Sequence, residues 1–380
     1  MFYWLYQLSD VFSPLRIFRY ITFRTVMAAG TAFILSLLLG PWLIKKLRAV
    51  NFGEQREDER VSGLDRSAKI GTPTMGGLLI LFTTAAATVL WAMPGNFYVL
   101  CALTTFGFLG SLGFIDDYLK IKRARGLSPA AKLLAQAGWT AVLLFALFSN
   151  EETVSRTQQL MVPFIKVPVI ASMGIIGTFL FIFLVLVGSS NAVNLTDGLD
   201  GLAIGCSNSA IGAYLVLAYV AGHFTFAEYL QVPFVQAGGE LTIFCGALFG
   251  AGLGFLWFNC HPARVFMGDT GSLAIGGGIA AVAILIKQEL VLVIVGGVFV
   301  LEAASVLIQQ GWFKYTRKRY GAGRRIFRCA PLHHHFEYIA KERAEKEGRP
   351  LGAAENMITV RFWIVSIIFA LIGVATLKIR

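Results

Sequence analysis

The chain has 380 residues, of which 56% are hydrophobic and only 14% are charged, and its formal net charge is +11. A mean hydropathy of +0.67 excludes an ordinary soluble domain and predicts a protein embedded in a bilayer. The positive charge could indicate nucleic-acid binding. However, the basic residues gather in alternate loops, as the positive-inside rule predicts for a membrane protein. We therefore expect a bilayer environment and no nucleic-acid partner.

Apolar runs close to the roughly 20 residues that cross about 30 Å of hydrocarbon occur about ten times. The expected spans are 22–44, 73–92, 97–115, 130–149, 170–189, 200–221, 240–258, 270–286, 288–310 and 359–378. No soluble domain of useful size remains between them, so we expect residues 1–380 to form a single integral membrane domain. Aromatic and basic residues in 1–21 predict an interfacial N-terminal segment.

The distribution of basic residues predicts the topology. Lysine and arginine concentrate in 45–72, after the third span, and most densely between Lys314 and Arg349, whereas the alternate loops carry few. With ten spans, both termini are expected on the periplasmic side. The expected cytoplasmic loops are 45–72, 116–129, 190–199, 259–269 and 311–358. The sequence thus predicts an all-α polytopic membrane protein with about ten transmembrane helices.

A polar stretch, NAVNLTDGLDG, directly follows the fifth apolar run. Its amides and carboxylates recur every third residue, at Asn191, Asn194, Asp197 and Asp200. In a helix, residues three apart share a face, so these four side chains would form one polar stripe. Gly198 and Gly201 weaken a helix and let another part of the chain or a ligand approach closely. A plain polar turn between two membrane helices is the alternative.

Further acidic residues lie at similar junctions. Asp116 and Asp117 end the third span, against the helix macrodipole, so following lysines or a bound cation should compensate them; solvated charge is the simpler reading. Asp269 lies between glycines where the eighth span begins, which suits either a metal ligand beside a phosphate or a helix N-cap. Phe266 is a candidate surface for stacking a planar base.

Two other segments could bind anions. In RSAKIGTPTMGG, residues 66–77, Thr72 to Thr74 predict a helix start, and Lys69 beside a helix N-terminus would suit an anion. The lysine could equally be a topology signal. In the last loop, His333, His334 and His335 are consecutive. Consecutive histidines seldom converge on one zinc ion and no cysteine lies at ligand spacing, so we expect them to face phosphate.

The five acids Asp116, Asp117, Asp197, Asp200 and Asp269 all lie at the predicted cytoplasmic ends of spans. Facing lipid, they would cost on the order of 15 kcal/mol, so they should line one wet cavity. Carboxylates that share a cation with phosphates are the usual setting for Mg²⁺. The pattern indicates phosphoryl transfer to a lipid. A transporter would place charges near the midplane and often show repeats, and a receptor would need fewer carboxylates.

Five motifs carry a resemblance to a known family: GTPTMGG at 71–77, DDYLK at 116–120, NAVNLTDGLDGLA at 191–203, FMGDTGSLA at 266–274 and APLHHHFE at 330–337. They closely resemble those of the bacterial phospho-N-acetylmuramoyl-pentapeptide transferases, within the polyprenyl-phosphate phosphoglycosyl transferase superfamily. The resemblance extends to the closing RFWIVSIIFALIGVATLKIR. The triple histidine separates this family from the related transferases that use UDP-N-acetylglucosamine. Residues 337–356 look longer than the family pattern.

The resemblance implies a ten-helix enzyme of the bacterial inner membrane, usually a homodimer, that requires Mg²⁺. It would join undecaprenyl phosphate to UDP-N-acetylmuramoyl-pentapeptide and release UMP and lipid I for peptidoglycan synthesis. The implied catalytic residues are Asp116, Asp117, Asp269 and His333, with Asp269, Asp116 and Asp117 as metal ligands. Uracil would meet Lys69, Asp200 and Phe266; the ribose and nearby groups would meet Thr74, Asn194 and Asp197. Asn191 belongs to the substrate site, and His333, His334 and His335 would face the diphosphate or sugar.

The chemistry of the acceptor favours one mechanism. A phosphate monoester has a second pKa near 6, so the lipid phosphate is largely dianionic at neutral pH and leaves a general base little to remove. Aspartate, with a reference pKa of about 3.9, would be a poor base. We therefore expect direct in-line attack on the β-phosphorus, with a covalent intermediate on Asp117 as the rival.

Overall fold

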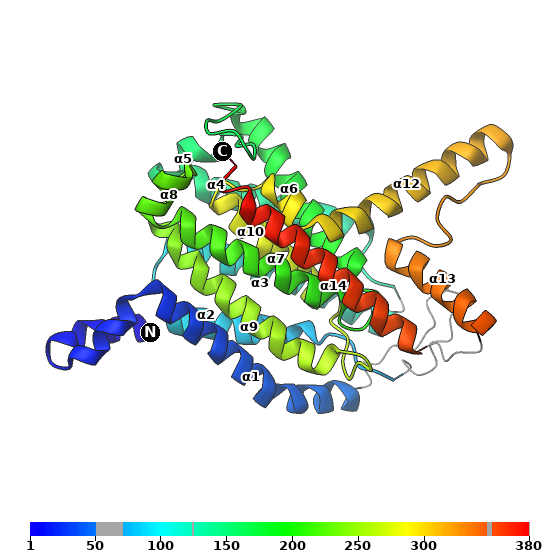
Figure 1. The fold of residues 1–380 in the computed structure, drawn as a ribbon, viewed down its shortest axis with the longest axis horizontal. Helices are drawn as coiled ribbons and strands as arrows, with labels where there is room; N and C mark the ends of the chain where they lie inside the picture. Colours follow the sequence, from blue (N-terminus) through cyan, green and yellow to red (C-terminus); the bar gives the residue numbers. More distant parts are fainter. Residues whose placement is uncertain (51–70, 124, 348–351, 380) are drawn as a thin grey trace.

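The computed structural model describes residues 1–50, 71–123, 125–347 and 352–379 (Figure 1). Its longer helices are α1 (Ile21–Ala49), α2 (Gly77–Trp91), α3 (Phe97–Arg123), α4 (Pro129–Ser149), α6 (Gly174–Thr196), α7 (Leu202–Ala221), α9 (Leu241–Asn259), α10 (Gly268–Leu285), α12 (Gly297–Tyr320), α13 (Leu332–Glu347) and α14 (Gly352–Ala375). Shorter elements are η1 (Phe2–Asp10), η2 (Ser13–Arg19), α5 (Glu151–Thr157), α8 (Phe224–Leu230), η5 (Gln236–Glu240) and α11 (Val291–Val295). The described part of the chain is thus helical, apart from an isolated β-bridge between Leu160 and Ile170 and a bridge residue at Pro73.

Eight helical segments among the described residues are long and apolar enough to cross a bilayer. They are Ile21–Ala49, Phe97–Arg123, Pro129–Ser149, Gly174–Thr196, Leu202–Ala221, Gln236–Asn259, Gly268–Leu285 and Glu355–Ala375. The expected span 73–92 corresponds to the shorter apolar helix α2, with 15 residues. The expected span 288–310 corresponds to α11 and the first half of α12. The polytopic all-helical class is therefore confirmed, whereas the number ten stays a prediction.

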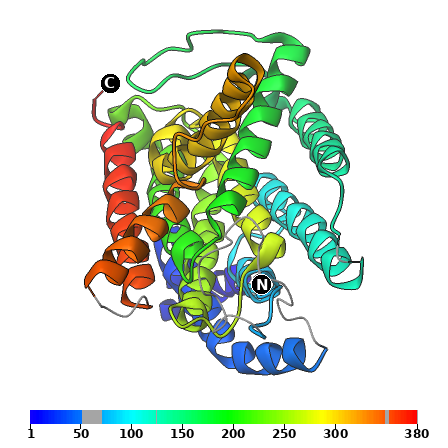
Figure 2. The same ribbon diagram turned by 90° about the vertical axis from the view of Figure 1, so that its right-hand side faces the viewer.

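Helix α10 forms the centre of the bundle (Figures 1 and 2), and every residue from Thr270 to Leu285 is buried. A helix that is apolar on all sides is stable only where other helices surround it. Small residues permit the close packing: a Cβ at Gly276 would lie 2.6 Å from the Ser189 carbonyl oxygen. Ser189 Oγ also donates to the Gly276 carbonyl at 2.7 Å. Figure 2 shows α14, in red, along one edge of the bundle.

Helix ends differ from the sequence prediction at three functional junctions. Helix α3 continues to Arg123, so Asp116 and Asp117 lie within the helix and not at its end. Helix α6 ends at Thr196, and the next residue, Asp197, has φ −79° and ψ 62°. The prediction of one polar stripe is therefore wrong, because the helix does not extend through the glycines that follow. The chain turns into α7 at Gly201, whose φ of 73° suits glycine.

The predicted helix start at Thr72 to Thr74 is also wrong. Helix α2 begins at Gly77, and its N-cap, Gly76, makes no side-chain capping bond. The preceding residues instead pair with the segment before α10: Phe266 N donates to the Pro73 carbonyl at 2.8 Å, and Gly76 N donates to the Phe266 carbonyl at 2.8 Å. These backbone hydrogen bonds between two extended segments take the place of a helix start capped by threonine. They hold the start of α2 against the start of α10.

Helix α12 extends ten residues beyond the predicted end of its span, to Tyr320, and projects from the bundle (Figure 1). Its last turn carries Arg317, Lys318 and Arg319, whose positive charges interact favourably with the negative end of the helix macrodipole. Helix α13 lies at this end of the molecule, whereas η1, α5 and α8 lie at the opposite end (Figure 1).

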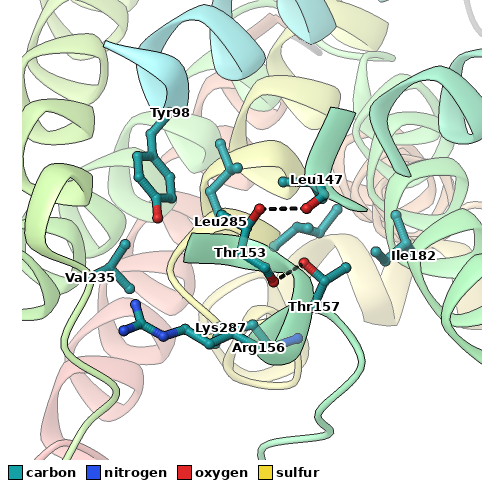
Figure 3. A pocket seen from close by; sticks show the side chains of 10 residues that line it. Tyr98, Leu147, Thr153, Arg156, Thr157, Ile182, Val235, Leu285 and Lys287 are labelled. Carbon is teal, nitrogen blue, oxygen red and sulfur yellow. Dashed lines mark hydrogen bonds between the residues drawn. The ribbon is translucent and has the colours of Figure 1, made fainter. Parts of the chain in front are cut away.

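A small cavity lies beside α5 (Figure 3), and α5 is at the end of the bundle opposite α13 (Figure 1). Its volume of about 20 Å³ accommodates about one water molecule. Its lining includes Tyr98, Arg156 and Lys287; Lys287 Nζ is 2.6 Å from Glu289 Oε1. A cavity of this size excludes a nucleotide or a lipid headgroup as its ligand.

A buried ion pair joins three elements at the N-terminal end of α1. Arg24 is 1% exposed, and its two terminal nitrogens donate to Glu240 at 2.8 and 2.6 Å. Arg24 also donates to the Trp91 carbonyl at 3.2 Å, and Glu240 accepts from the Met93 N–H at 2.8 Å. The pair therefore holds α1, the end of α2 and η5 together.

We predict that Glu240→Ala destabilises the protein by about 3–5 kcal/mol, because it leaves the Arg24 guanidinium buried without its counter-charge. The double substitution Arg24→Met with Glu240→Leu should cost much less, because both charges are removed together. Thermal unfolding of the purified protein in one detergent measures both. Equal losses for the single and double variants would contradict the prediction.

Candidate active site

Three predicted carboxylates meet at the junction of α3 and α10. Asp116 and Asp117 come from the last two turns of α3, and Asp269 comes from the first turn of α10. One oxygen from each lies within 4.8 Å of the others. The side chain of Asp116 is 0% exposed and that of Asp269 is 14% exposed, so the cluster is largely shielded but open on the Asp269 side.

Asp117 caps the N-terminus of α10. Its Oδ2 accepts from the Thr270 N–H at 2.9 Å and from Thr270 Oγ1 at 2.8 Å, and its Oδ1 accepts from the Asp269 N–H at 3.2 Å. The first N–H groups of a helix lack partners within the helix, so a carboxylate from α3 here satisfies them and meets the positive end of the macrodipole. The alternative that Asp269 itself is the N-cap is therefore wrong: the N-cap position is Met267.

Two lysines neutralise the other two carboxylates. Lys132 Nζ, from the first turn of α4, donates at 2.8 Å to both Asp116 and Asp269. Lys120 Nζ lies 2.7 Å from Asp116 and 3.1 Å from Asp269. Asp116 also accepts from the Leu127 N–H at 2.6 Å. Two bridging ammonium groups allow two carboxylates to remain charged at close distance.

The two predicted asparagines have different hydrogen-bond partners. Asn194 Nδ2 donates to Asp269 Oδ1 at 2.9 Å and to Ser272 Oγ at 2.8 Å, so Asn194 belongs to the carboxylate cluster. Asn191 Nδ2 instead donates to the Val187 carbonyl at 2.8 Å and to Gln136 Oε1 at 3.3 Å. Asn191 thus contacts α4, and these two hydrogen bonds of its side chain are not made to the carboxylate cluster.

Thr74 and Phe266 are brought beside the cluster by the pairing of their segments. Gly268, with φ 71°, is the contact point: a Cβ there would lie 2.6 Å from Asp117 Oδ2 and 2.9 Å from Thr74 Oγ1. A side chain at this position would push apart two predicted site residues. Lys69 lies outside the described residues.

Asp200 forms a second polar group with the loop that precedes Phe266. Its Oδ2 accepts from the Ala263 N–H at 3.1 Å and lies 3.1 Å from His261 Nδ1. Glu355 Oε2 is 4.0 Å from the same nitrogen. Asn259 Oδ1 accepts from the Gly201 N–H at 3.1 Å, and Asn259 Nδ2 donates to the Val265 carbonyl at 2.9 Å. The turn 197–201 is therefore fixed to the loop 259–266.

The three consecutive histidines point to three different partners. His333 Nδ1 is 3.1 Å from Glu302 Oε2, and His334 Nδ1 is 2.9 Å from Glu337 Oε2. His335 Nδ1 accepts from the Arg328 N–H at 3.2 Å. Burial and the nearby Arg328 side chain lower the pKa of His335, which favours the neutral ring that this bond requires. The Nδ1 atom of His335 is therefore engaged within the protein, and the expectation that the three histidines face the diphosphate or sugar stays a prediction.

His333 reaches the polar turn between α6 and α7. A Cβ at Gly198 would overlap His333 Nε2, so the imidazole packs directly against this glycine. The close approach predicted for the glycines of this turn is made by a side chain of α13. It brings the histidine motif to the same turn that carries Asp197, which is half-buried, and Asp200.

Four residues of this network were not identified from the sequence: Lys132, Gln136, Asn259 and Glu302. Two of these residues could have been identified from the sequence by their charge. Glu302 is an acid within an apolar run, and an ionisable residue inside a membrane segment indicates function by default. Lys132 is a comparable isolated charge at the start of α4. Asn259 and Gln136 offered no such signal, because single amides near helix ends are common.

The donor set suits a hard divalent cation. Three carboxylates within reach of one another offer the oxygen ligands that Mg²⁺ prefers. Asp117 is engaged by α10, whereas the oxygens of Asp116 and Asp269 face the lysine ammonium groups. Asp116 and Asp269 are therefore the acids with oxygens closest to the ammonium groups, whereas Asp117, whose Oδ1 is 3.8 Å from Lys120 Nζ, also fixes the helix that carries Asp269.

Residues 97–287 match the sequence model described as glycosyl transferase family 4. The chain is 47% identical to the phospho-N-acetylmuramoyl-pentapeptide-transferase of Syntrophus aciditrophicus (strain SB), over 100% of both chains. It is 48% identical to the protein of that name from Desulfatibacillum aliphaticivorans and 46% identical to the one from Maridesulfovibrio salexigens, again over 100% of both chains.

We predict that Gly198→Ala lowers the activity of the protein about tenfold or more, because the new methyl displaces the His333 ring. Gly188→Ala is the matched control: it lies on α6, where a Cβ would meet nothing within 4 Å. Steady-state kinetics and thermal unfolding of both variants separate a local effect from loss of fold. Full activity of Gly198→Ala would show that the ring position is unimportant.

Proposed function

The chain belongs to glycosyl transferase family 4, and from that membership we propose the reaction that its relatives' name describes. It transfers phospho-N-acetylmuramoyl-pentapeptide from its UDP-linked form to undecaprenyl phosphate and releases UMP. The product is lipid I, an intermediate of peptidoglycan synthesis. The protein is a multi-pass transferase of the bacterial inner membrane. Full-length identity of 46–48% to proteins of this name is the observation that carries the assignment.

The site supports this reaction chemically. A diphosphate substrate and a phosphate acceptor need positive groups, and Lys120 and Lys132 supply two at the carboxylate cluster. We propose that Asp269 and Asp116 hold Mg²⁺, with Asp117 as the third acid of the site. Mg²⁺ bound there would neutralise charge that develops on the leaving UMP. The lysines would then be available to the phosphate oxygens.

We propose the following contacts for the nucleotide sugar. Asp200 and Phe266 lie on one connected turn and loop and would hold the uracil together with Lys69. Thr74, Asn194 and Asp197 would meet the ribose and nearby groups, with Asn191 on the same helix as Asn194 and bonded to Gln136 of α4. His333 and His334 would contact the diphosphate or sugar. His335 would act by fixing the loop that carries Arg328.

We further propose that the chain forms one membrane domain with about ten spans, with the carboxylate cluster and α13 at the cytoplasmic face. Both termini would lie on the periplasmic side. This arrangement agrees with the basic residues at the end of α12 and with the position of η1 opposite α13 (Figure 1). A homodimer is the proposed assembly.

The geometry of Asp117 favours direct transfer over a covalent intermediate. Both of its oxygens accept hydrogen bonds from the start of α10, which lowers the nucleophilicity of the carboxylate and holds α10 in place. We propose that a lipid phosphate oxygen attacks the β-phosphorus in line. A new bond forms between this oxygen and phosphorus while the bond to the oxygen bridging the α-phosphate breaks, and UMP leaves with the electron pair.

The first prediction of this proposal concerns substrate and metal. Purified protein should release UMP from UDP-N-acetylmuramoyl-pentapeptide only with undecaprenyl phosphate and Mg²⁺ present, and chelation should abolish the release. Asp269→Asn should lower the rate by roughly 10²- to 10³-fold, as loss of a charge-stabilising group does. A nucleotide-release assay measures all of these. Release from UDP-N-acetylglucosamine instead would keep the superfamily and reject the sugar.

A second prediction concerns the mechanism. Because one phosphoanhydride breaks and another forms, the reaction should be reversible, and labelled UMP should exchange into the nucleotide sugar only when undecaprenyl phosphate is present. Thr270→Val is a useful companion, since it removes the hydroxyl donor to Asp117; the lipid requirement should persist in it. Exchange without lipid, or a phosphosugar adduct trapped on the enzyme, would reject direct transfer.

A further inference from the structure

Glu302 is a buried acid on α12, with 0% exposure. A carboxylate buried in this way is costly unless donors compensate it. Both of its oxygens bond to one residue at the start of α13. Oε1 accepts from the His333 N–H at 3.1 Å, and Oε2 lies 3.1 Å from His333 Nδ1. The acid thus holds both the backbone and the ring of His333.

This contact determines which ring nitrogen carries the hydrogen. A backbone N–H can only donate, so it must face an accepting oxygen, and a carboxylate accepts at both oxygens. With Glu302 as a carboxylate, Nδ1 carries its hydrogen toward Oε2. The partner of one imidazole nitrogen sets the state of the other, so any change in protonation of this ring occurs at Nε2.

The Nε2 atom is placed for a ligand. It is buried, and no hydrogen-bond partner occurs for it among the described residues. It lies against Gly198, in the turn that also carries Asp197 and Asp200. A buried polar atom without a partner is costly and uncommon in folded proteins, and in this position a polar group of the substrate would satisfy it.

We propose that Glu302 is a positioning residue for the transfer reaction: it keeps the proton of His333 on Nδ1 and presents Nε2 to the diphosphate and sugar of the nucleotide substrate. The inference rests on the proposed function for its substrate. When the anionic diphosphate favours an imidazolium, the Glu302 carboxylate balances that charge, and Nε2–H is the donor to the substrate. A carboxylate orients and stabilises an imidazole in this way in other active sites.

The chain contains a matched control. Glu337 Oε2 lies 2.9 Å from His334 Nδ1, so a second acid contacts a second histidine of the same motif through the same atom. Glu337 is on α13 itself, three residues from His334. Glu337→Gln therefore makes the same chemical change beside the neighbouring ring and leaves the Glu302 contact intact.

Glu302→Gln separates ring orientation from helix attachment. The glutamine carbonyl oxygen can still accept the His333 N–H. The amide group then faces Nδ1 as a donor, which moves the ring hydrogen to Nε2. In the opposite orientation the glutamine NH₂ group would face the His333 backbone N–H. Both groups are donors, so this orientation is disfavoured. The substitution retains the shape of the side chain while it reverses the roles of the two ring nitrogens.

The direct test is ¹⁵N NMR of the full-length, histidine-labelled protein in alkaline buffer. Five histidines make assignment practical, by loss of the His333 signals in His333→Asn. The wild type and Glu337→Gln should show a protonated Nδ1 and an unprotonated Nε2 for His333, and Glu302→Gln should show the reverse. A wild-type ring protonated on Nε2, or a ring unchanged in Glu302→Gln, overturns the inference.

The kinetic test is a double-mutant cycle. Glu302→Gln should lower kcat for UMP release roughly 10- to 100-fold, the range typical for loss of a supporting partner, with an unchanged unfolding temperature. In a His333→Asn background, Glu302→Gln should have no further effect. A further loss there would show that Glu302 acts through the helix and would overturn the inference. Full activity of His333→Asn alone would instead reject the substrate contact in the proposed function, while the NMR result would still report on Glu302.

Discussion

A carboxylate placed inside a membrane protein must be compensated by donors or cations, and this constraint determines how the site is built. Asp117 is compensated by the N-terminus of α10, and Asp116 and Asp269 are compensated by two lysines. These contacts join α3, α4 and α10. The contacts that compensate these charges are therefore also the contacts that fix the geometry of the cluster. If α10 shifted, the buried carboxylate of Asp117 would lose its hydrogen-bond donors, which is energetically unfavourable.

The second constraint is close approach between backbones. A Cβ at Gly113 would overlap the Asp269 carbonyl, and one at Gly77 would overlap the backbone of Gly271. Helices that pack through small residues approach more closely than those that carry larger side chains. At this site the close approach brings Asp117 of α3 within hydrogen-bonding distance of the α10 N–H groups. The glycines thus act at the same junction as the charges, and neither would suffice without the other.

The sequence predicted the class of the fold because hydropathy reports directly on the bilayer. It also predicted the acids that gather, because charges at span ends stand out against apolar runs. It failed where tertiary contacts decide: α3 continues through Asp116 because Lys120 and Lys132 neutralise it, and the strand-like pairing of Pro73 with Phe266 replaces a capped helix start. The orientation of His333 depends on Glu302, an acid distant in the sequence, which no local pattern reveals.

The two lysines that bridge the acids provide positive charge that could also bind phosphate groups. Lys132 and Lys120 each contact both Asp116 and Asp269, so a divalent cation on these carboxylates would weaken four contacts together. The ammonium groups would then turn to phosphate oxygens without a new source of charge. In this arrangement cation binding and phosphate binding favour each other. A cation would replace the lysines as partners of the carboxylates, and phosphate would replace the carboxylates as partners of the lysines. The same reasoning explains why the acids are so fully bonded in the structure: a site that kept its lysines unpaired would repel a divalent cation.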